Sequence, residues 1–230
     1  MKEVKERPML FSGPMVRAIL DGRKTQTRRV VKGGPFYPGI EKFEFTLHPF
    51  APSTFRGTPA EGVRVAPEKK VWVAIDFCDN EIGILGDCPY GVPGDRLFVK
   101  EDWYLHPAMM DDADFYIYRA NPPHWASRVE WKPAKTMPSE ASRIIIEVTN
   151  VRVERLQDIS EDDARAEGIR VLPMQDVSDP SAWWQSAPGT HQARTAQGAF
   201  CLLWDSIAKS GQTWDDNSWV WVIEFRRVEE

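Results

Sequence analysis

Residues that bind metals or form disulfides are scarce in this sequence. It has three cysteines, Cys78, Cys88 and Cys201, and four histidines, and none has the short paired spacing of a zinc site or a disulfide framework. The nucleophile elbow and the glycine-rich phosphate loop are also missing. We therefore expect neither a metal nor a cofactor, so any chemistry must rest on other side chains.

Long apolar runs and an excess of positive charge are absent as well. No window approaches the ~20 apolar residues of a membrane span, and the opening residues, MKEVKERPMLF, lack the apolar run of a signal peptide. The net charge of -5 argues against bulk, sequence-independent binding to duplex DNA, although it leaves room for a local basic pocket. We expect a soluble, cytoplasmic protein with no membrane partner.

The sequence does have enough apolar material for a sizeable core. The chain has 230 residues, of which 42% are hydrophobic, and it carries ten tryptophans. Most of these tryptophans are expected to pack in the core, and one or two could line a pocket in which a flat base stacks. These totals are consistent with a single domain over residues 1–230.

Alternation and capping patterns predict an α+β fold. Strands are predicted over residues 71–77, 96–100, 116–118, 144–153 and 219–227. Helices are predicted over residues 14–21, 161–167 and 196–207. Two irregular segments separate these elements: a glycine- and proline-rich loop over 33–70 and an insertion over 104–142. The scattered order of the strands favours a small closed or half-closed barrel with short helices at its rim.

A basic segment, DGRKTQTRRVV at 21–31, lies where the first helix ends and a strand begins. In a regular strand Lys24 and Thr27 would point to opposite faces, because the side-chain period is two. We predict a turn or bulge near Thr25–Gln26, which would let both side chains face one pocket.

The crowding of cations in this segment suggests chemistry for Lys24 and Thr27. Neighbouring positive charges and partial burial disfavour a protonated amine, and a neutral lysine is a general base toward a hydroxyl. Thr27 is then a candidate nucleophile, and nearby arginines could stabilise an oxyanion or hold a phosphate. The simpler interpretation, a solvated basic edge, stays open.

Glu167 is an acid in an unusual position. It is predicted to lie in the last turn of a helix that ends at Gly168, where the helix dipole disfavours a carboxylate. Such a residue is either exposed or directed into a pocket, where it would suit a general acid.

Four blocks of the sequence resemble the ASCH domain, a PUA-like β-barrel. They are FSGPMVRAILDGRKTQTRRVV, CPYGVPGDRLFVKEDW, IEVTNVRVERLQDISEDDARAEGI and the closing VWVIEF, and they occur in the same order as in ASCH proteins of bacteriophages and prophages. A small bacterial member of the family is an amidohydrolase that removes the acetyl group from N4-acetylcytidine. The small enzyme lacks two long insertions, at about 33–92 and 100–142 of this chain, so the resemblance implies a small PUA-like barrel with these two insertions added to it.

The resemblance also assigns roles to residues. The family's Arg-Lys-Thr-x-Thr-x-Arg run matches this chain from Arg23 to Arg29, and its glutamate at a helix end matches Glu167. Lys24 would be the base, Thr27 the nucleophile and Glu167 the proton donor. The substrate-binding residues it implies are Arg23, Thr25, Arg29, Ser12 and Trp103.

Three functions remain open from the sequence. The first is hydrolysis of an acyl amide on a cytidine-type base, with a nucleoside or RNA-derived small molecule as substrate. The second is a non-catalytic module that binds single-stranded RNA or a modified base. The third is a metal-independent ribonuclease. The sequence predicts no particular oligomeric state.

Overall fold

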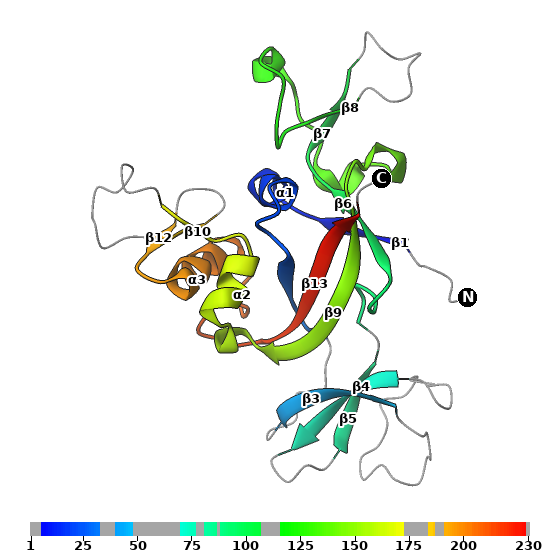
Figure 1. Cartoon of the computed structure of the whole chain (residues 1–230), viewed down its shortest axis with the longest axis vertical. Helices are drawn as coiled ribbons and strands as arrows, with labels where there is room; N and C mark the ends of the chain where they lie inside the picture. The colour runs from blue at the N-terminus through cyan, green and yellow to red at the C-terminus, as the bar shows by residue number, and fades with distance from the viewer. Residues whose placement is uncertain are drawn as a thin grey trace.

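A curved five-stranded sheet organises the chain (Figure 1). The structure, a computed structural model, describes residues 6–32, 40–47, 70–76, 81–86, 88–106, 116–172, 184–186 and 191–228. In spatial order the strands of the sheet are β1 (Glu6–Leu10), β6 (Arg96–Lys100), β9 (Ile145–Arg155), β13 (Trp219–Val228) and β2 (Gln26–Val30). The β1–β6 pair is parallel and the other pairs are antiparallel. Together with the helices, this sheet makes the protein a mixed α+β fold, as the sequence predicts.

The two edges of the sheet, β1 and β2, approach each other without pairing along their backbones. Arg29 on β2 reaches across with Nη2, which donates a 3.0 Å hydrogen bond to the carbonyl oxygen of Leu10 at the end of β1. In the described part of the chain, a side chain therefore joins the edges where a closed barrel would have a backbone ladder. The predicted PUA-like barrel remains a prediction.

Both faces of the sheet are buried, which explains the unbroken apolar run at its centre. In β13 the side chains of Trp219, Trp221 and Ile223 pack on one face with the core of β6 and β9. Val220 and Val222 point to the other face, where they pack against Phe200 and its neighbours.

Three helices position the site. Helix α1 (Gly13–Leu20) connects β1 to β2, whereas α2 (Glu161–Ala166) and α3 (Ala196–Ile207) lie side by side over the second face of the sheet (Figure 1). Ser160 and Thr195 cap α2 and α3, each accepting a 3.0 Å hydrogen bond from a backbone N–H of the first turn. None of the helices in the described segments is long and apolar enough to cross a membrane.

The remaining elements lie mostly in the predicted insertions. A separate antiparallel sheet is formed by β3 (Ile40–Leu47), β4 (Lys70–Asp76) and β5 (Glu81–Gly86). The second insertion holds β7 (Trp103–Leu105), β8 (Tyr116–Tyr118) and the 3₁₀ helices η2 (Ala126–Arg128), η3 (Ala134–Thr136) and η4 (Ser139–Ala141). Helix η5 (Leu156–Asp158) follows β9, and a small sheet comprises β10 (Arg170–Val171), β11 (Trp184–Gln185) and β12 (Gln192–Ala193).

Most predicted elements are confirmed to within a residue or two. The predicted loop over 33–70 is wrong at β3, because IEKFEFTL, which alternates from Lys42 to Leu47, forms a strand inside glycine- and proline-rich surroundings. Strand β5 was likewise not expected from the sequence. The assignment of the whole chain to one domain remains a prediction.

Candidate functional site

Lys24 and Glu167 form a buried pair between the start of β2 and the end of α2. The Lys24 Nζ lies 2.5 Å from Glu167 Oε2 and 2.9 Å from the backbone oxygen of the same residue. Both side chains are almost completely buried, with 1% of Lys24 and 5% of Glu167 exposed. Two residues 143 positions apart in the chain thus meet out of solvent, and the alternative of an exposed Glu167 is wrong.

Backbone pairing brings the two side chains together. Lys24 and Glu167 form an isolated antiparallel bridge, and the Thr25 N–H donates to the carbonyl oxygen of Ala166 at 2.9 Å. Gly168 follows with a φ of +99°, and a Cβ on it would lie 3.2 Å from the Cβ of Ala18. Glycine is therefore needed here both for the left-handed turn and for the close approach of α2 to α1.

Burial controls the charge of Lys24. Loss of solvent lowers the pKa of the Lys24 amine below its ordinary value; Glu167 opposes this effect, whereas Arg29 and Arg28 add to it. The sequence prediction of a destabilised ammonium agrees with this direction, but burial has a larger effect than the neighbouring cations. A lysine in this setting loses its proton more readily than an exposed one.

Thr27 is also buried, with 1% of the residue exposed. Its Oγ1 accepts a 3.0 Å hydrogen bond from Arg29 Nη1. The Arg29 guanidinium and the Lys24 amine both lie near the ring of Phe11, at 5.4 and 5.9 Å from its centroid. Phe11 is therefore a common neighbour of the Lys24 amine and of the arginine that holds Thr27, although none of the described hydrogen bonds joins Lys24 to Thr27.

The backbone is irregular close to the predicted position. Strand β2 begins only at Gln26, and Lys24 lies outside it in its bridge to α2. Strand β2 itself pairs with β13 in regular register from Gln26 to Val30. A register shift occurs nearby in the pairing of β13 with β9, between Glu224 and Phe225, and the Phe225 N–H donates to the Thr25 carbonyl oxygen at 2.8 Å. This arrangement frees Lys24 from strand alternation, so that it reaches Glu167 while Thr27 keeps a strand geometry.

The other predicted binding residues are only partly gathered here. Arg23 lies beside the pair, where Nη1 donates to the carbonyl oxygen of Gly168 at 3.3 Å, and Thr25 is exposed next to it. Ser12 is exposed at the start of α1. Trp103 is buried in a different cluster, with Met137 and Ala141.

The placement of Trp103 gives no support to a substrate-binding role at this site. Its Nε1 donates to Thr136 Oγ1 at 3.3 Å, and the amine of Lys132 lies 4.8 Å from its ring centroid. Its described contacts are therefore with the second insertion, where it serves as a packing residue.

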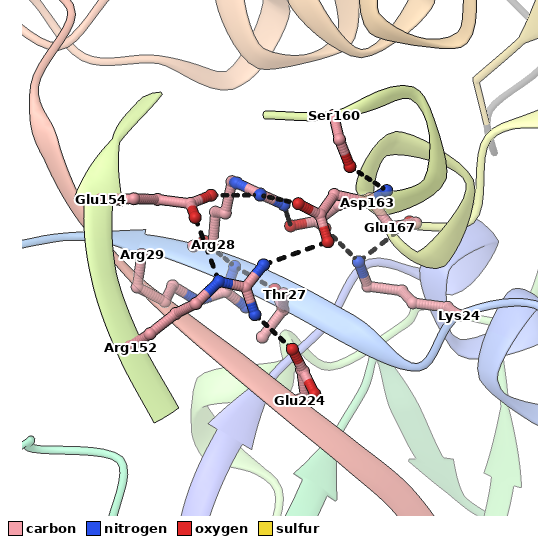
Figure 2. Close-up of polar contacts among 10 residues, drawn as sticks. All are labelled: Lys24, Thr27, Arg28, Arg29, Arg152, Glu154, Ser160, Asp163, Glu167 and Glu224. Carbon is pink, nitrogen blue, oxygen red and sulfur yellow. Dashed lines mark hydrogen bonds and ion pairs between the residues drawn. The ribbon is translucent and has the colours of Figure 1, made fainter. Parts of the chain in front are cut away.

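Arg28 is a site residue to which the sequence analysis gave no role. Its side chain is fully buried, and it contacts three acids at once: Glu154, Asp163 and Glu167. Figure 2 shows the dashed contacts that run from Lys24 to Glu167 and from Glu167 to Arg28. Glu154 and Asp163 then join Arg28 to Arg152, which also pairs with Glu224. The available signal was the alternation of β2, which places Arg28 on the face opposite Thr27 and Arg29, toward α2 and α3.

The chemistry that these groups can support is proton transfer and nucleophilic attack. The site combines an amine with a lowered pKa, a carboxyl within hydrogen-bond reach of it, and a hydroxyl held by an arginine. Among the described residues, no group of three or more histidine, cysteine, aspartate or glutamate side chains is placed to hold a metal ion.

Comparison of the chain with protein-family models, with curated proteins and with solved structures finds no match in any of the three. Membership of the ASCH family therefore remains a prediction from the sequence blocks.

Proposed function

We propose that the protein is an amidohydrolase that removes an acyl group from N4 of a cytidine-type nucleoside, built on a PUA-like barrel. The observation that carries this proposal is the buried pair of Lys24 and Glu167, 2.5 Å apart, in which Lys24 lies three residues before the buried Thr27 in the same segment. A buried lysine whose pKa is lowered is costly to keep for stability alone, and such groups gather at sites that move protons.

One proton shared by the Lys24–Glu167 pair gives the site both partners of acid–base catalysis. When this proton lies on the carboxyl, the amine is neutral and can take the proton of the Thr27 hydroxyl as the oxygen attacks the acyl carbon. The carboxyl of Glu167 then donates its proton to the exocyclic nitrogen as the C–N bond breaks. Water hydrolyses the acyl-threonine, which releases the carboxylic acid and regenerates the hydroxyl.

Arg29 is suited to hold the nucleophile and to balance charge. It donates to the Thr27 oxygen at 3.0 Å, so its guanidinium lies where negative charge develops during attack. In the free protein the hydroxyl is bonded to Arg29, and the bond to Lys24 forms in the substrate complex, where catalytic contacts commonly tighten.

A binding module for RNA or a modified base is the second candidate, and one observation favours it. The polar groups of Lys24, Thr27 and Glu167 already have partners in the free protein: Lys24 binds Glu167, and Thr27 binds Arg29. Such a satisfied set of groups is compatible with a site that binds a ligand without reacting with it. In this alternative the basic edge around Arg23 holds phosphate. Either function would place the protein in the cytoplasm with nucleosides or RNA.

One experiment separates these functions. The purified protein is incubated with N4-acetylcytidine and, separately, with a short single-stranded RNA, beside the variant Lys24→Met. Release of cytidine by the wild type but not by Lys24→Met supports the amidohydrolase. RNA retention without turnover supports the binding module, and shortened RNA supports a metal-independent ribonuclease; either result without cytidine release overturns the proposal. Arg226→Gln, which alters an exposed pair with Glu147, is the matched control.

A further inference from the structure

The side chain of Arg28 is completely buried, and its guanidinium is only partly paired. Its side chain has no exposed surface, and its guanidinium lies 5.8 Å from the ring centroid of Phe200. The Nη2 group pairs with Glu154 and, at 3.3 Å, with Asp163, while Nη1 lies 3.4 Å from Glu167 Oε1. Its Nε has no hydrogen-bond partner within the described residues.

Stability alone does not explain this arginine. Taking a guanidinium out of water and leaving one N–H unpaired is costly, and a buried ion pair often adds less stability than apolar packing would. The next residue on the same face of β2, Val30, packs against the apolar cluster under α3. A residue like Val30 would fill the position of Arg28 without that cost.

The geometry gives Arg28 a specific relation to Glu167. The two oxygens of the carboxyl are held by different cations, Oε2 by Lys24 and Oε1 by Arg28. Glu167 is the C-cap residue that follows α2, and its backbone is fixed by the bridge to Lys24, so rotation of the side chain is the freedom that remains. A cation on each oxygen removes that freedom.

We propose that Arg28 is a positioning residue of this site and acts through Glu167: by holding Oε1 it fixes the plane of the carboxyl and draws part of the carboxylate charge away from the Lys24 amine. Its contact with reacting atoms is indirect, since strand alternation puts it on the face opposite Thr27. This inference rests on the proposed function for its effect on rate, but its effect on Lys24 can be measured without turnover.

The charges around the pair predict the direction of that effect. Glu167, Arg29 and Arg28 are the charged groups that act on the Lys24 amine, and Arg28 adds to the lowering of its pKa. The variant Arg28→Met removes this cation and also leaves the carboxyl to Lys24 and Arg29. Both changes favour the protonated amine, so the pKa of Lys24 rises in this variant.

A matched control lies in the same network. Arg152 pairs with Glu154 at 3.0 Å, with Asp163 at 3.0 Å and with Glu224, but it has no contact with Glu167 among the described ion pairs. The variant Arg152→Met therefore disturbs the network without touching the carboxyl. We expect it to leave the titration of Lys24 unchanged.

The experiment is an NMR titration of lysines labelled at Cε in the full chain, with the Lys24 signal identified by its absence from Lys24→Met. It is run on the wild type, Arg28→Met, Arg152→Met, Glu167→Gln and the Glu167→Gln/Arg28→Met double variant. We expect a raised pKa of Lys24 in Arg28→Met and a clearly smaller rise when Glu167 is already glutamine, because an effect that passes through Glu167 is not additive. Kinetics with N4-acetylcytidine should show kcat lowered by about 10- to 100-fold with KM nearly unchanged.

Two results would overturn the inference. One is an unchanged Lys24 titration in Arg28→Met, and the other is an equal shift with and without Glu167, which would make Arg28 a plain neighbouring charge. If Arg28→Met does not fold, the same titration and kinetics are measured on Arg28→Lys. This variant keeps the positive charge but loses the planar guanidinium that contacts three acids at once. If the wild type releases no cytidine, the proposed function is wrong, and the titration still tests the role of Arg28.

Discussion

Among the residues that the structure describes, two glutamates, Glu101 and Glu167, are buried against cations, and their partners differ. Glu101, which follows β6, is 1% exposed at its side chain, and both of its oxygens are bound by Arg143, at 2.8 Å from Nε and 3.1 Å from Nη2. Arg143 also donates to Asn121 at 2.6 Å, and its guanidinium lies 4.0 Å from the ring centroid of Tyr118. Glu167 is buried as deeply, but its closest partner is a lysine.

The difference shows which pair can do chemistry. A guanidinium stays charged and fits a carboxylate with two parallel bonds, so Glu101 and Arg143 form a clamp that fastens the segment after β8 to β6 and β9. An amine can lose its proton, and burial lowers the pKa of Lys24 toward that change. In the proposed mechanism the neutral amine then takes the proton of the Thr27 hydroxyl.

The largest effect is expected from removing the amine. In Lys24→Met, kcat for N4-acetylcytidine falls by about 10²- to 10⁴-fold, the contribution typical of a general base. Steady-state cytidine release measures it, and circular dichroism shows whether the variant is folded. A folded Lys24→Met with wild-type kcat would remove the distinction between the two pairs.

Breaking the clamp is expected to cost stability and leave catalysis intact. Arg143→Met leaves a buried carboxylate without its cation, and the free energy of unfolding falls by about 3 kcal/mol, at the lower end for a buried pair because Arg143 is partly exposed. Urea unfolding gives this value. Loss of turnover in the folded variant would show that the clamp, too, belongs to the active site.

The pH dependence of the rate sharpens the comparison. Because the active form holds one proton on the Lys24–Glu167 pair, kcat/KM falls as pH rises through the pKa of Lys24, where that proton is lost; burial and the neighbouring arginines place this pKa below the ordinary lysine value. The falling limb therefore lies at lower pH than for an exposed lysine. A pH–rate profile that falls only at the ordinary lysine pKa of ~10.4 would contradict the role of burial.

The clamp has a pH dependence of its own, in stability. Burial raises the pKa of Glu101, and the bonds from Arg143 oppose that rise. A raised carboxyl pKa means that the folded state holds the proton more tightly, so this contribution to stability is present at low pH and is lost as pH rises from the unfolded pKa of ~4.3 through the folded one. Relative to Glu101→Gln, the wild type should become less stable across that window in urea titrations. A difference that is constant with pH would contradict it.

The smallest effect is expected for an exposed pair. Arg226→Gln breaks the contact with Glu147, in which 69% of the arginine side chain is exposed, and the free energy of unfolding should change by no more than ~0.5 kcal/mol. Thermal melts beside Arg143→Met test the contrast. Equal losses in the two variants would mean that burial is not what separates them.

The sequence predicts the helices and strands of this fold better than it predicts how the two edges of the sheet meet. Alternation in WVWVIEF and the cap at Ser160 determine β13 and α2 locally, and both form as expected. The meeting of β1 and β2 through Arg29 depends on the curvature of the whole sheet, which no local pattern encodes. Strand β3 was missed because its glycine- and proline-rich flanks outweighed the alternation from Lys42 to Leu47.

The residues of the site likewise divide into those that the sequence predicted and those that only the fold reveals. Lys24 and Glu167 were predicted to meet because a family resemblance paired them, since composition alone could not join residues 143 positions apart. Arg28 received no role because its importance lies in three acids that the fold brings from β9 and α2. Trp103 was expected at the site, but its position in the insertion depends on packing with Met137 that the sequence does not reveal.

The most direct test of the account is cytidine release from N4-acetylcytidine by three proteins measured side by side: the wild type, Thr27→Val and Arg143→Met. Thr27→Val replaces the hydroxyl by a methyl group of similar size at a buried position, so it removes the nucleophile with little change in packing volume. We predict turnover by the wild type and by folded Arg143→Met, and none by Thr27→Val. Turnover by Thr27→Val at the wild-type rate would contradict the account.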